Sequence, residues 1–195
     1  SYSIEKLNET QKKIIDEWEL KREEAAKKGT LLHEAIEEYY NRGELSDLIP
    51  EFKFFQEFLK KYPKIQPYRT EWRVFDPKNS IAGTIDMVYK KNNGDLFIFD
   101  WKRSTKLVND IGTVIKSDFD YGFDELSNIS NNSYNKYCLQ QNLYKYILED
   151  NYGKQVSSMN LLVLHPRYHT YFHIQVPDLT KETEFLIRKA REKVI

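Results

Sequence analysis

Two aspartates and a lysine stand out because each interrupts an otherwise apolar segment. Asp86 directly follows Ile85, and Asp100 and Lys102 lie on either side of Trp101 in a second apolar run. A buried carboxylate is strongly unfavourable unless a cation, a metal ion or a set of hydrogen-bond donors compensates it. If the second segment is a strand, Asp100 and Lys102 project from the same face, because they are two residues apart.

These three residues have the chemistry that phosphodiester hydrolysis needs. A turn signal at residues 92–95 joins the two segments into a hairpin, which brings Asp86 within reach of Asp100. Carboxylate oxygens suit Mg²⁺ or Mn²⁺, which activate a bound water and offset charge on a phosphate. Lys102 would orient that water or stabilise the transition state. The alternative is a buried Asp–Lys ion pair with only a structural role.

The elements that position these residues can be predicted from apolar periodicity and turn signals. A single α/β domain is expected over residues 1–195, with a mixed central sheet flanked by helices. The segments 1–62, 68–176 and 181–195 form its helical N-terminal part, its sheet core and its C-terminal helix. Helices are predicted at 8–28, 31–40, 51–62 and 135–149, with Gly29 and Thr30 interrupting the first two, and strands at 68–75, 81–89, 95–102, 157–165 and 170–176. Residues 109–133 are polar and irregular, which is typical of a functional or mobile loop.

The composition limits the choice of partners and cofactors. The net charge is 0, with 30 basic and 30 acidic residues, so charge gives no support for a nucleic-acid partner unless the acidic residues gather around metal ions. The one cysteine excludes a disulfide, a cysteine zinc site and a four-cysteine iron–sulfur cluster, and it favours an intracellular setting. We expect no membrane segment, because no apolar run approaches the roughly 20 residues required, and no secretory signal at residues 1–4.

The segment 71–102 resembles the core of the PD-(D/E)XK nuclease superfamily, in particular its RecB-like exonuclease branch. That branch has a histidine on an upstream helix, often four residues after a glycine, then G-x-x-D, D/E-x-K and Q-x-x-x-Y motifs in this order. The matching residues in this chain are Gly29 and His33, Gly83 and Asp86, Asp100 and Lys102, and Gln140 and Tyr144.

The resemblance implies a restriction-endonuclease-like fold and a Mg²⁺- or Mn²⁺-dependent deoxyribonuclease. It predicts an exonuclease that acts on single strands or free ends, with DNA as its partner and a further protein partner in replication, repair or recombination. By the same resemblance, His33, Asp86, Asp100 and the Trp101 carbonyl would bind metal, Lys102 would act in catalysis, and Gln140 and Tyr144 would lie near the substrate backbone.

Three further residues and three other functions remain open. Glu71 is either an additional metal ligand or an ordinary edge-strand residue, and Arg103 and Lys106 either contact phosphates or are solvated. An endonuclease domain of a larger viral or phage replication protein would use the same chemistry. A non-catalytic nucleic-acid-binding module on a nuclease-like fold would not, nor would an unrelated α/β domain with a structural ion pair.

Overall fold

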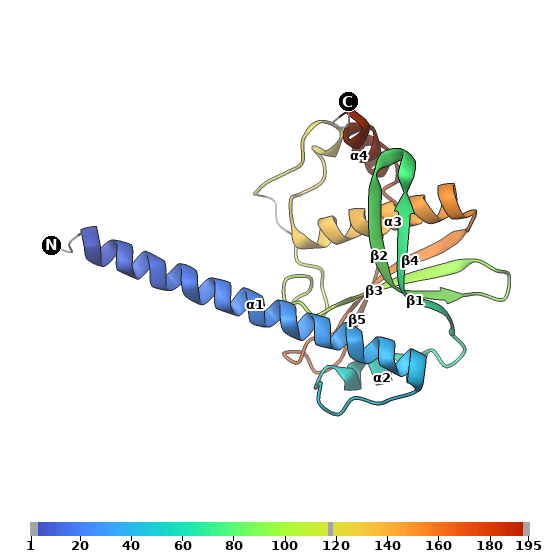
Figure 1. The fold of residues 1–195 in the computed structure, drawn as a ribbon, viewed down its shortest axis with the longest axis horizontal. Helices are drawn as coiled ribbons and strands as arrows, with labels where there is room; N and C mark the ends of the chain where they lie inside the picture. Colours follow the sequence, from blue (N-terminus) through green and yellow to red (C-terminus); the bar gives the residue numbers. More distant parts are fainter. Residues whose placement is uncertain (1–3, 117–118, 193–195) are drawn as a thin grey trace.

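The computed structural model describes residues 4–116 and 119–192, in three layers with the sheet in the middle (Figure 1). The start of the chain, the middle of segment 109–133 and the last residues of segment 181–195 were covered by our predictions and lie outside the described residues. The main elements are α1 (Ile4–Arg42), α2 (Phe52–Lys61), β1 (Gln66–Asp76), β2 (Ile81–Lys90), β3 (Leu96–Lys102), α3 (Ser133–Tyr152), β4 (Val156–Val163), β5 (Phe172–Gln175) and α4 (Thr180–Glu192).

The sheet is mixed, with the strands in the order β1-β2-β3-β4-β5. β1, β2 and β3 form the predicted antiparallel meander, β3 and β4 are parallel, and β5 is antiparallel to β4. A parallel neighbour requires a crossover, and α3 provides it between β3 and β4. The predicted fold class is therefore confirmed: this is an α/β domain with a restriction-endonuclease-like core.

The predicted break at Gly29 and Thr30 is wrong, because α1 runs without interruption from Ile4 to Arg42. A glycine inside a helix costs only about 1 kcal/mol relative to alanine. Thr30 Oγ1 donates a hydrogen bond to the Ala26 carbonyl one turn earlier, and the following turns pack Leu32 and Ile36 into the core. Packing on one side and a long helix on the other outweigh that small cost. The first half of α1 extends away from the rest of the chain (Figure 1).

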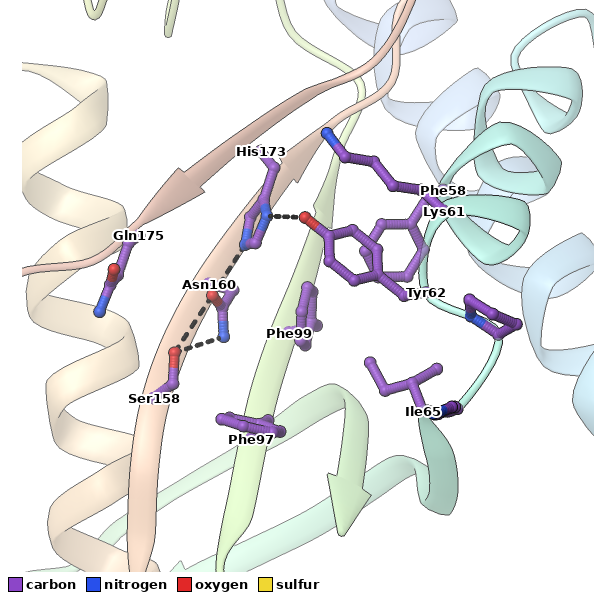
Figure 2. Close-up of a pocket in the computed structure, with 12 residues that line it drawn as sticks. Phe58, Lys61, Tyr62, Ile65, Phe97, Phe99, Ser158, Asn160, His173 and Gln175 are labelled. Carbon is purple, nitrogen blue, oxygen red and sulfur yellow. Dashed lines mark hydrogen bonds between the residues drawn. The ribbon is translucent and has the colours of Figure 1, made fainter. Parts of the chain in front are cut away.

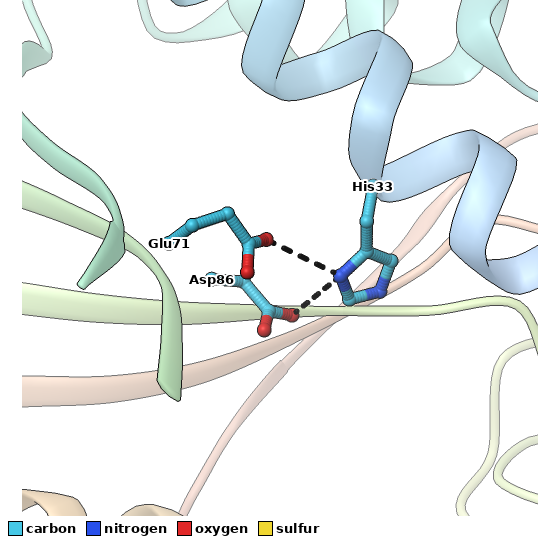
Figure 3. A group of neighbouring side chains, drawn as sticks. All are labelled: His33, Glu71 and Asp86. Atoms are coloured by element: carbon cyan, nitrogen blue, oxygen red, sulfur yellow. Dashed lines mark ion pairs between the residues drawn. The ribbon is translucent and has the colours of Figure 1, made fainter. Parts of the chain in front are cut away.

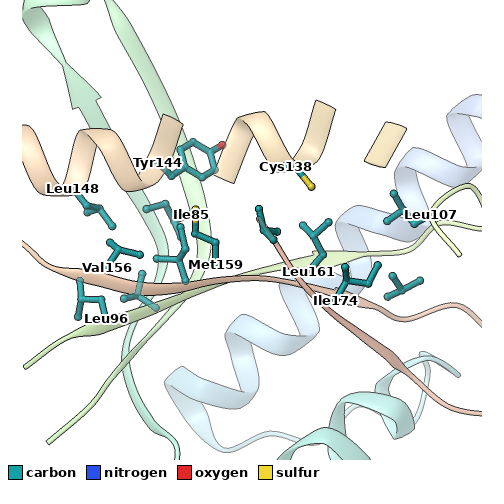
Figure 4. Close-up of a cluster of buried hydrophobic side chains, with 14 of the residues drawn as sticks. Ile85, Leu96, Leu107, Cys138, Tyr144, Leu148, Val156, Met159, Leu161 and Ile174 are labelled. Carbon is teal, nitrogen blue, oxygen red and sulfur yellow. The ribbon is translucent and has the colours of Figure 1, made fainter. Parts of the chain in front are cut away.

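Two apolar clusters hold the sheet between its helices. One lies between the sheet and α3 and includes Ile85, Ile98, Leu148 and Leu161 (Figure 4). The other, on the opposite face, joins α1 and α2 to the sheet through residues such as Phe55 and Trp101. The side chains of β3 alternate between these clusters, as expected for a strand buried on both faces. No helix in the described part of the chain is long and apolar enough to cross a membrane.

Segment 109–133 has little regular structure, as predicted. In its described residues it contains a 3₁₀ turn, η2 (Asp124–Leu126), and takes part in two isolated bridges, Val108↔Val114 and Tyr121↔Ser130. The Arg188 side chain of α4 forms an ion pair with Glu125, which ties this segment to the C-terminal helix.

Candidate functional site

The candidate site lies where β2 and β3 separate. Their ladder ends at the pair Met87↔Phe99, and one residue further along the same register stand Asp86 and Asp100. Beyond the last pair, the Trp101 backbone N–H donates to Asp86 Oδ2 at 2.7 Å. A carboxylate thus takes the place of a ladder carbonyl, and the fork leaves both aspartate side chains side by side instead of closing the sheet over them.

Three potential metal ligands from three different elements meet at this fork (Figure 3). His33 of α1 has its Nδ1 3.6 Å from Glu71 Oε1 of β1 and 3.6 Å from Asp86 Oδ2 of β2. One ligand atom from each of the three residues lies within 4.8 Å of the others. This spacing allows a single cation to contact all three side chains.

Glu71 reaches this group through an unusual backbone conformation. The pairs Thr70↔Met87 and Trp72↔Ile85 place Glu71 opposite Asp86, and its φ of +43° lies in the left-handed region. A non-glycine residue there costs about 1–3 kcal/mol, and such strain is concentrated at functional sites. The conformation supports the interpretation of Glu71 as part of the site rather than as an ordinary edge residue.

The hydrogen bond of His33 fixes which nitrogen faces the carboxylates. His33 Nε2 lies 2.9 Å from the Trp101 carbonyl oxygen, which can only accept, so Nε2 carries the proton and Nδ1 points to Glu71 and Asp86. Burial lowers the pKa of His33, but the bond to Glu71 and the charge of Asp86 outweigh burial and raise the pKa to about 9. In the absence of a metal, a proton on Nδ1 balances the carboxylates.

The aspartates and Lys102 form the buried half of the site. Lys102 Nζ lies 2.6 Å from Asp100 Oδ2 and 4.3 Å from the centroid of the Tyr137 ring. Burial, followed by the charge of Asp100, raises the pKa of Asp86 to about 7. Burial also raises the pKa of Asp100, while it lowers that of Lys102, whose pKa is nevertheless raised because both aspartates favour the ammonium. The two carboxylates are thus crowded and short of positive charge.

Helix α3 brings the last two motif residues to the same place. Gln140 Nε2 donates to Tyr144 Oη at 3.0 Å, while Gln140 Oε1 is buried without a hydrogen-bond partner. Tyr144 lies against Gly83 of β2, where an added Cβ would come within 2.5 Å of Tyr144 Cε1. The burial of Tyr144 and the nearby charges of Asp100 and Asp86 raise the pKa of its hydroxyl. Gly83 therefore allows the tyrosine to approach the carboxylates.

Gly83→Ala tests this close contact. We expect the substitution to lower the free energy of unfolding by about 1–3 kcal/mol, because the buried ring must move to admit the methyl group. Chemical denaturation measures the change, and the loss should shrink in a Tyr144→Leu background, which removes the ring. Gly29→Ala is the matched control, because a Cβ at Gly29 meets no atom within 4 Å. An equal effect of the two glycine substitutions would contradict the proposed contact.

The two basic candidates for phosphate contacts differ. Arg103 is drawn into an ion pair with the buried Glu51, so its guanidinium is already engaged. Lys106 is exposed on the segment that follows β3. The structure thus leaves Lys106 accessible to a substrate and gives Arg103 a structural partner that sequence spacing could not reveal, since Glu51 lies 52 residues earlier.

An open cavity of about 680 Å³ lies beside the metal-ligand group. Its lining includes residues that the sequence alone did not single out: Glu34, Glu37, Arg73 and Thr84. Glu37 was considered as a ligand because it follows His33 by one turn, and the structure places it on the cavity wall without joining the compact group. Tyr137 was also missed, although its spacing of three and seven residues from Gln140 and Tyr144 puts all three on one helix face.

The comparisons with known proteins concern the fold. No protein-family model matches the chain, and no curated protein matches it. Among solved structures, the fold is similar to the crystal structure of a "putative exonuclease" from Eubacterium rectale, with a TM-score of 0.50 and 13% sequence identity. The match covers 86% of this chain and 66% of the other, so the chain spans about two thirds of the length of that protein. At this identity the likeness establishes a shared fold.

Proposed function

We propose that this protein is a Mg²⁺- or Mn²⁺-dependent nuclease that hydrolyses phosphodiester bonds in DNA, related to the RecB-like branch of the PD-(D/E)XK superfamily. One observation carries the proposal: the ligand group His33, Glu71 and Asp86 adjoins the Asp100–Lys102 pair at the fork between β2 and β3. The fold shared with the Eubacterium rectale protein supports a nuclease.

The donor set fits a hard divalent cation. It combines one imidazole nitrogen with carboxylate oxygens, and the crowded carboxylates gain from an added positive charge. Asp86, Glu71 and His33 Nδ1 would hold the ion, with Asp100 beside it. When bound, the ion would acidify a water molecule and offset charge on the phosphate. The Trp101 carbonyl, a ligand candidate, is engaged by His33 Nε2 and would orient the imidazole instead, as carbonyls commonly do for metal-binding histidines.

The remaining side chains have roles that follow from their positions. Lys102 is held by Asp100 and by the Tyr137 ring, so its ammonium is fixed where it can stabilise negative charge on a reacting phosphate. Tyr144 accepts a hydrogen bond from Gln140, which leaves the hydroxyl proton available for the substrate backbone. Lys106, exposed nearby, would contact a phosphate further along the strand.

The charge of the cavity agrees with a need for metal before substrate. Glu34, Glu37 and Glu71 line it against a single Arg73, so a bare polyanion would be repelled there. This explains how a chain of net charge 0 can act on DNA, because bound cations reverse the local charge. We propose single strands or free ends as the substrate, and a protein partner in replication, repair or recombination that adds affinity.

The test is cleavage of end-labelled single-stranded and duplex DNA with Mn²⁺, Mg²⁺ or EDTA, beside a covalently closed circle of the same sequence. We expect metal-dependent shortening of linear DNA and no cut in the circle. Nicking or linearisation of the circle would instead identify an endonuclease. Failure to cleave any DNA or an RNA control, together with no effect of Mn²⁺ on the melting temperature, would overturn the proposal.

A further inference from the structure

A second cavity, of about 580 Å³, lies on the other face of the sheet. Phe97 and Phe99 of β3 form part of its lining, and they alternate with Ile98 and Asp100, so they point away from the face that carries the Asp100 carboxylate. The cavity is completed by the end of α2 and the turn after it, by β4 and by β5. Its volume is in the range of about 300–1,000 Å³ that is common for small-molecule sites.

The walls of this cavity suit a flat ring. Figure 2 shows Phe97 and Phe99 along β3 on one side, with Tyr62 and Ile65 across from them. Phe58 lies behind Tyr62, with the two ring centroids 5.0 Å apart. Aromatic side chains bind planar partners through offset-stacked or edge-to-face contacts in addition to apolar burial. A planar aromatic ligand would therefore gain more from these walls than a compact polar one.

One side of the cavity carries a fixed polar network. Asn160 Nδ2 donates to the Ile98 carbonyl at 3.1 Å, so Asn160 Oδ1 faces His173 Nε2 at 2.8 Å and accepts its proton. Ser158 Oγ also donates to Asn160 Oδ1, at 3.2 Å. His173 Nδ1 is then the acceptor that faces Tyr62 Oη, at 3.5 Å. Because Asn160 is buried and anchored to the backbone, this edge offers polar atoms in set positions (Figure 2).

The charges around the cavity have one sign. Lys61 and Lys64 line it, and Lys91 Nζ lies 4.4 Å from the centroid of the Phe97 ring. No aspartate or glutamate is among the lining residues in the part of the chain that the structure describes. An anionic group on the ligand would find lysine ammonium groups at the rim, while the ring lies between the aromatic walls.

We propose that this cavity binds a small planar aromatic molecule that carries an anionic group. A mononucleotide and an aromatic carboxylate share this chemistry. The proposal is independent of the metal-dependent activity, because none of the cavity's lining residues belongs to the candidate nuclease site.

Isothermal titration calorimetry in EDTA tests the proposal with four probes: adenosine 5′-monophosphate, adenosine, indole-3-acetate and inorganic phosphate. We expect at least one aromatic anion to bind with a Kd below about 1 mM, adenosine to bind about tenfold more weakly than its monophosphate, and phosphate not to bind. Binding of the nucleotide alone or of indole-3-acetate alone supports the proposal and identifies the source of the ligand. Absence of binding by both anions, or phosphate binding as tightly as the nucleotide, overturns it.

Variants locate the binding. The double substitution Lys61→Ala with Lys64→Ala removes two exposed charges without touching the core, and we expect it to weaken the aromatic anion about tenfold. Phe97→Ala should abolish binding, with thermal unfolding as the check on its fold. Lys60→Ala is the matched control, because Lys60 is exposed on the same helix and does not line the cavity. An equal loss in the Lys60 variant would contradict the assignment, whereas Lys102→Ala should bind normally even where DNA cleavage fails.

Discussion

Replacing Lys102 with alanine should lower the rate of metal-dependent DNA cleavage by about 10²–10³-fold, the usual effect of removing one fixed group that stabilises transition-state charge. The reason is positional: Lys102 is 16% exposed and is held by Asp100 and the Tyr137 ring. An ammonium fixed in this way needs little reorganisation when negative charge develops on a phosphate. The rate is measured on end-labelled linear DNA under single-turnover conditions with saturating Mn²⁺.

Two further measurements separate catalysis from folding. Lys102→Ala should retain the rise in melting temperature that Mn²⁺ produces in the wild type, because His33, Glu71 and Asp86 remain in place. Lys90→Ala is the control, since Lys90 is exposed on β2 at the far end of the fork. Wild-type cleavage by the Lys102 variant would show that the Asp100–Lys102 pair is only structural, which is the alternative that the sequence left open.

Replacing Asp86 with asparagine should stabilise the metal-free protein at neutral pH by about 1–3 kcal/mol while it abolishes cleavage. Asp86 is 8% exposed, and burial and Asp100 raise its pKa from 3.8 to about 7 in the folded state. A carboxyl with a raised folded pKa favours folding while it is protonated. This contribution is lost as the pH rises from about 4 to about 7, and asparagine has no charge to acquire over that range.

The sign of the effect gives the experiment its discrimination. In EDTA, the stability advantage of Asp86→Asn should be small near about pH 5 and large near about pH 8, measured by chemical denaturation. Asp47→Asn, an exposed aspartate, should show no such change. His33 has a raised folded pKa of about 9, so it stabilises the fold below about pH 6.5 and loses this contribution as the pH rises through 9. A His33→Gln background removes that overlapping titration.

Addition of Mn²⁺ should reverse the ranking of the two proteins. The ion stabilises whichever protein binds it in the folded state, so the wild type should gain stability and Asp86→Asn should gain little. If the variant is less stable than the wild type at about pH 8 without metal, the carboxylate is compensated within the protein itself. That result would favour a structural role for Asp86.

The local pattern of this sequence determined most of the elements. Strand alternation and the turn at residues 92–95 predicted the meander, and the two-residue spacing of Asp100 and Lys102 put both on one face of β3, where they form an ion pair. These features depend on neighbouring residues and on the fixed period of a strand, so sequence spacing is enough. The α/β class followed from the same order of elements.

Only the tertiary structure decided which distant side chains meet. The register of β1 on β2, with an irregularity between Pro67 and Arg69, places Glu71 opposite Asp86, and no local signal predicts either that register or the left-handed backbone of Glu71. The ion pair of Arg103 with Glu51 and the continuity of α1 through Gly29 have the same origin. Each depends on packing between segments far apart in the chain, which outweighs local preferences of about 1 kcal/mol. The sequence therefore predicted the catalytic pair, and the fold determined the ligand group around it.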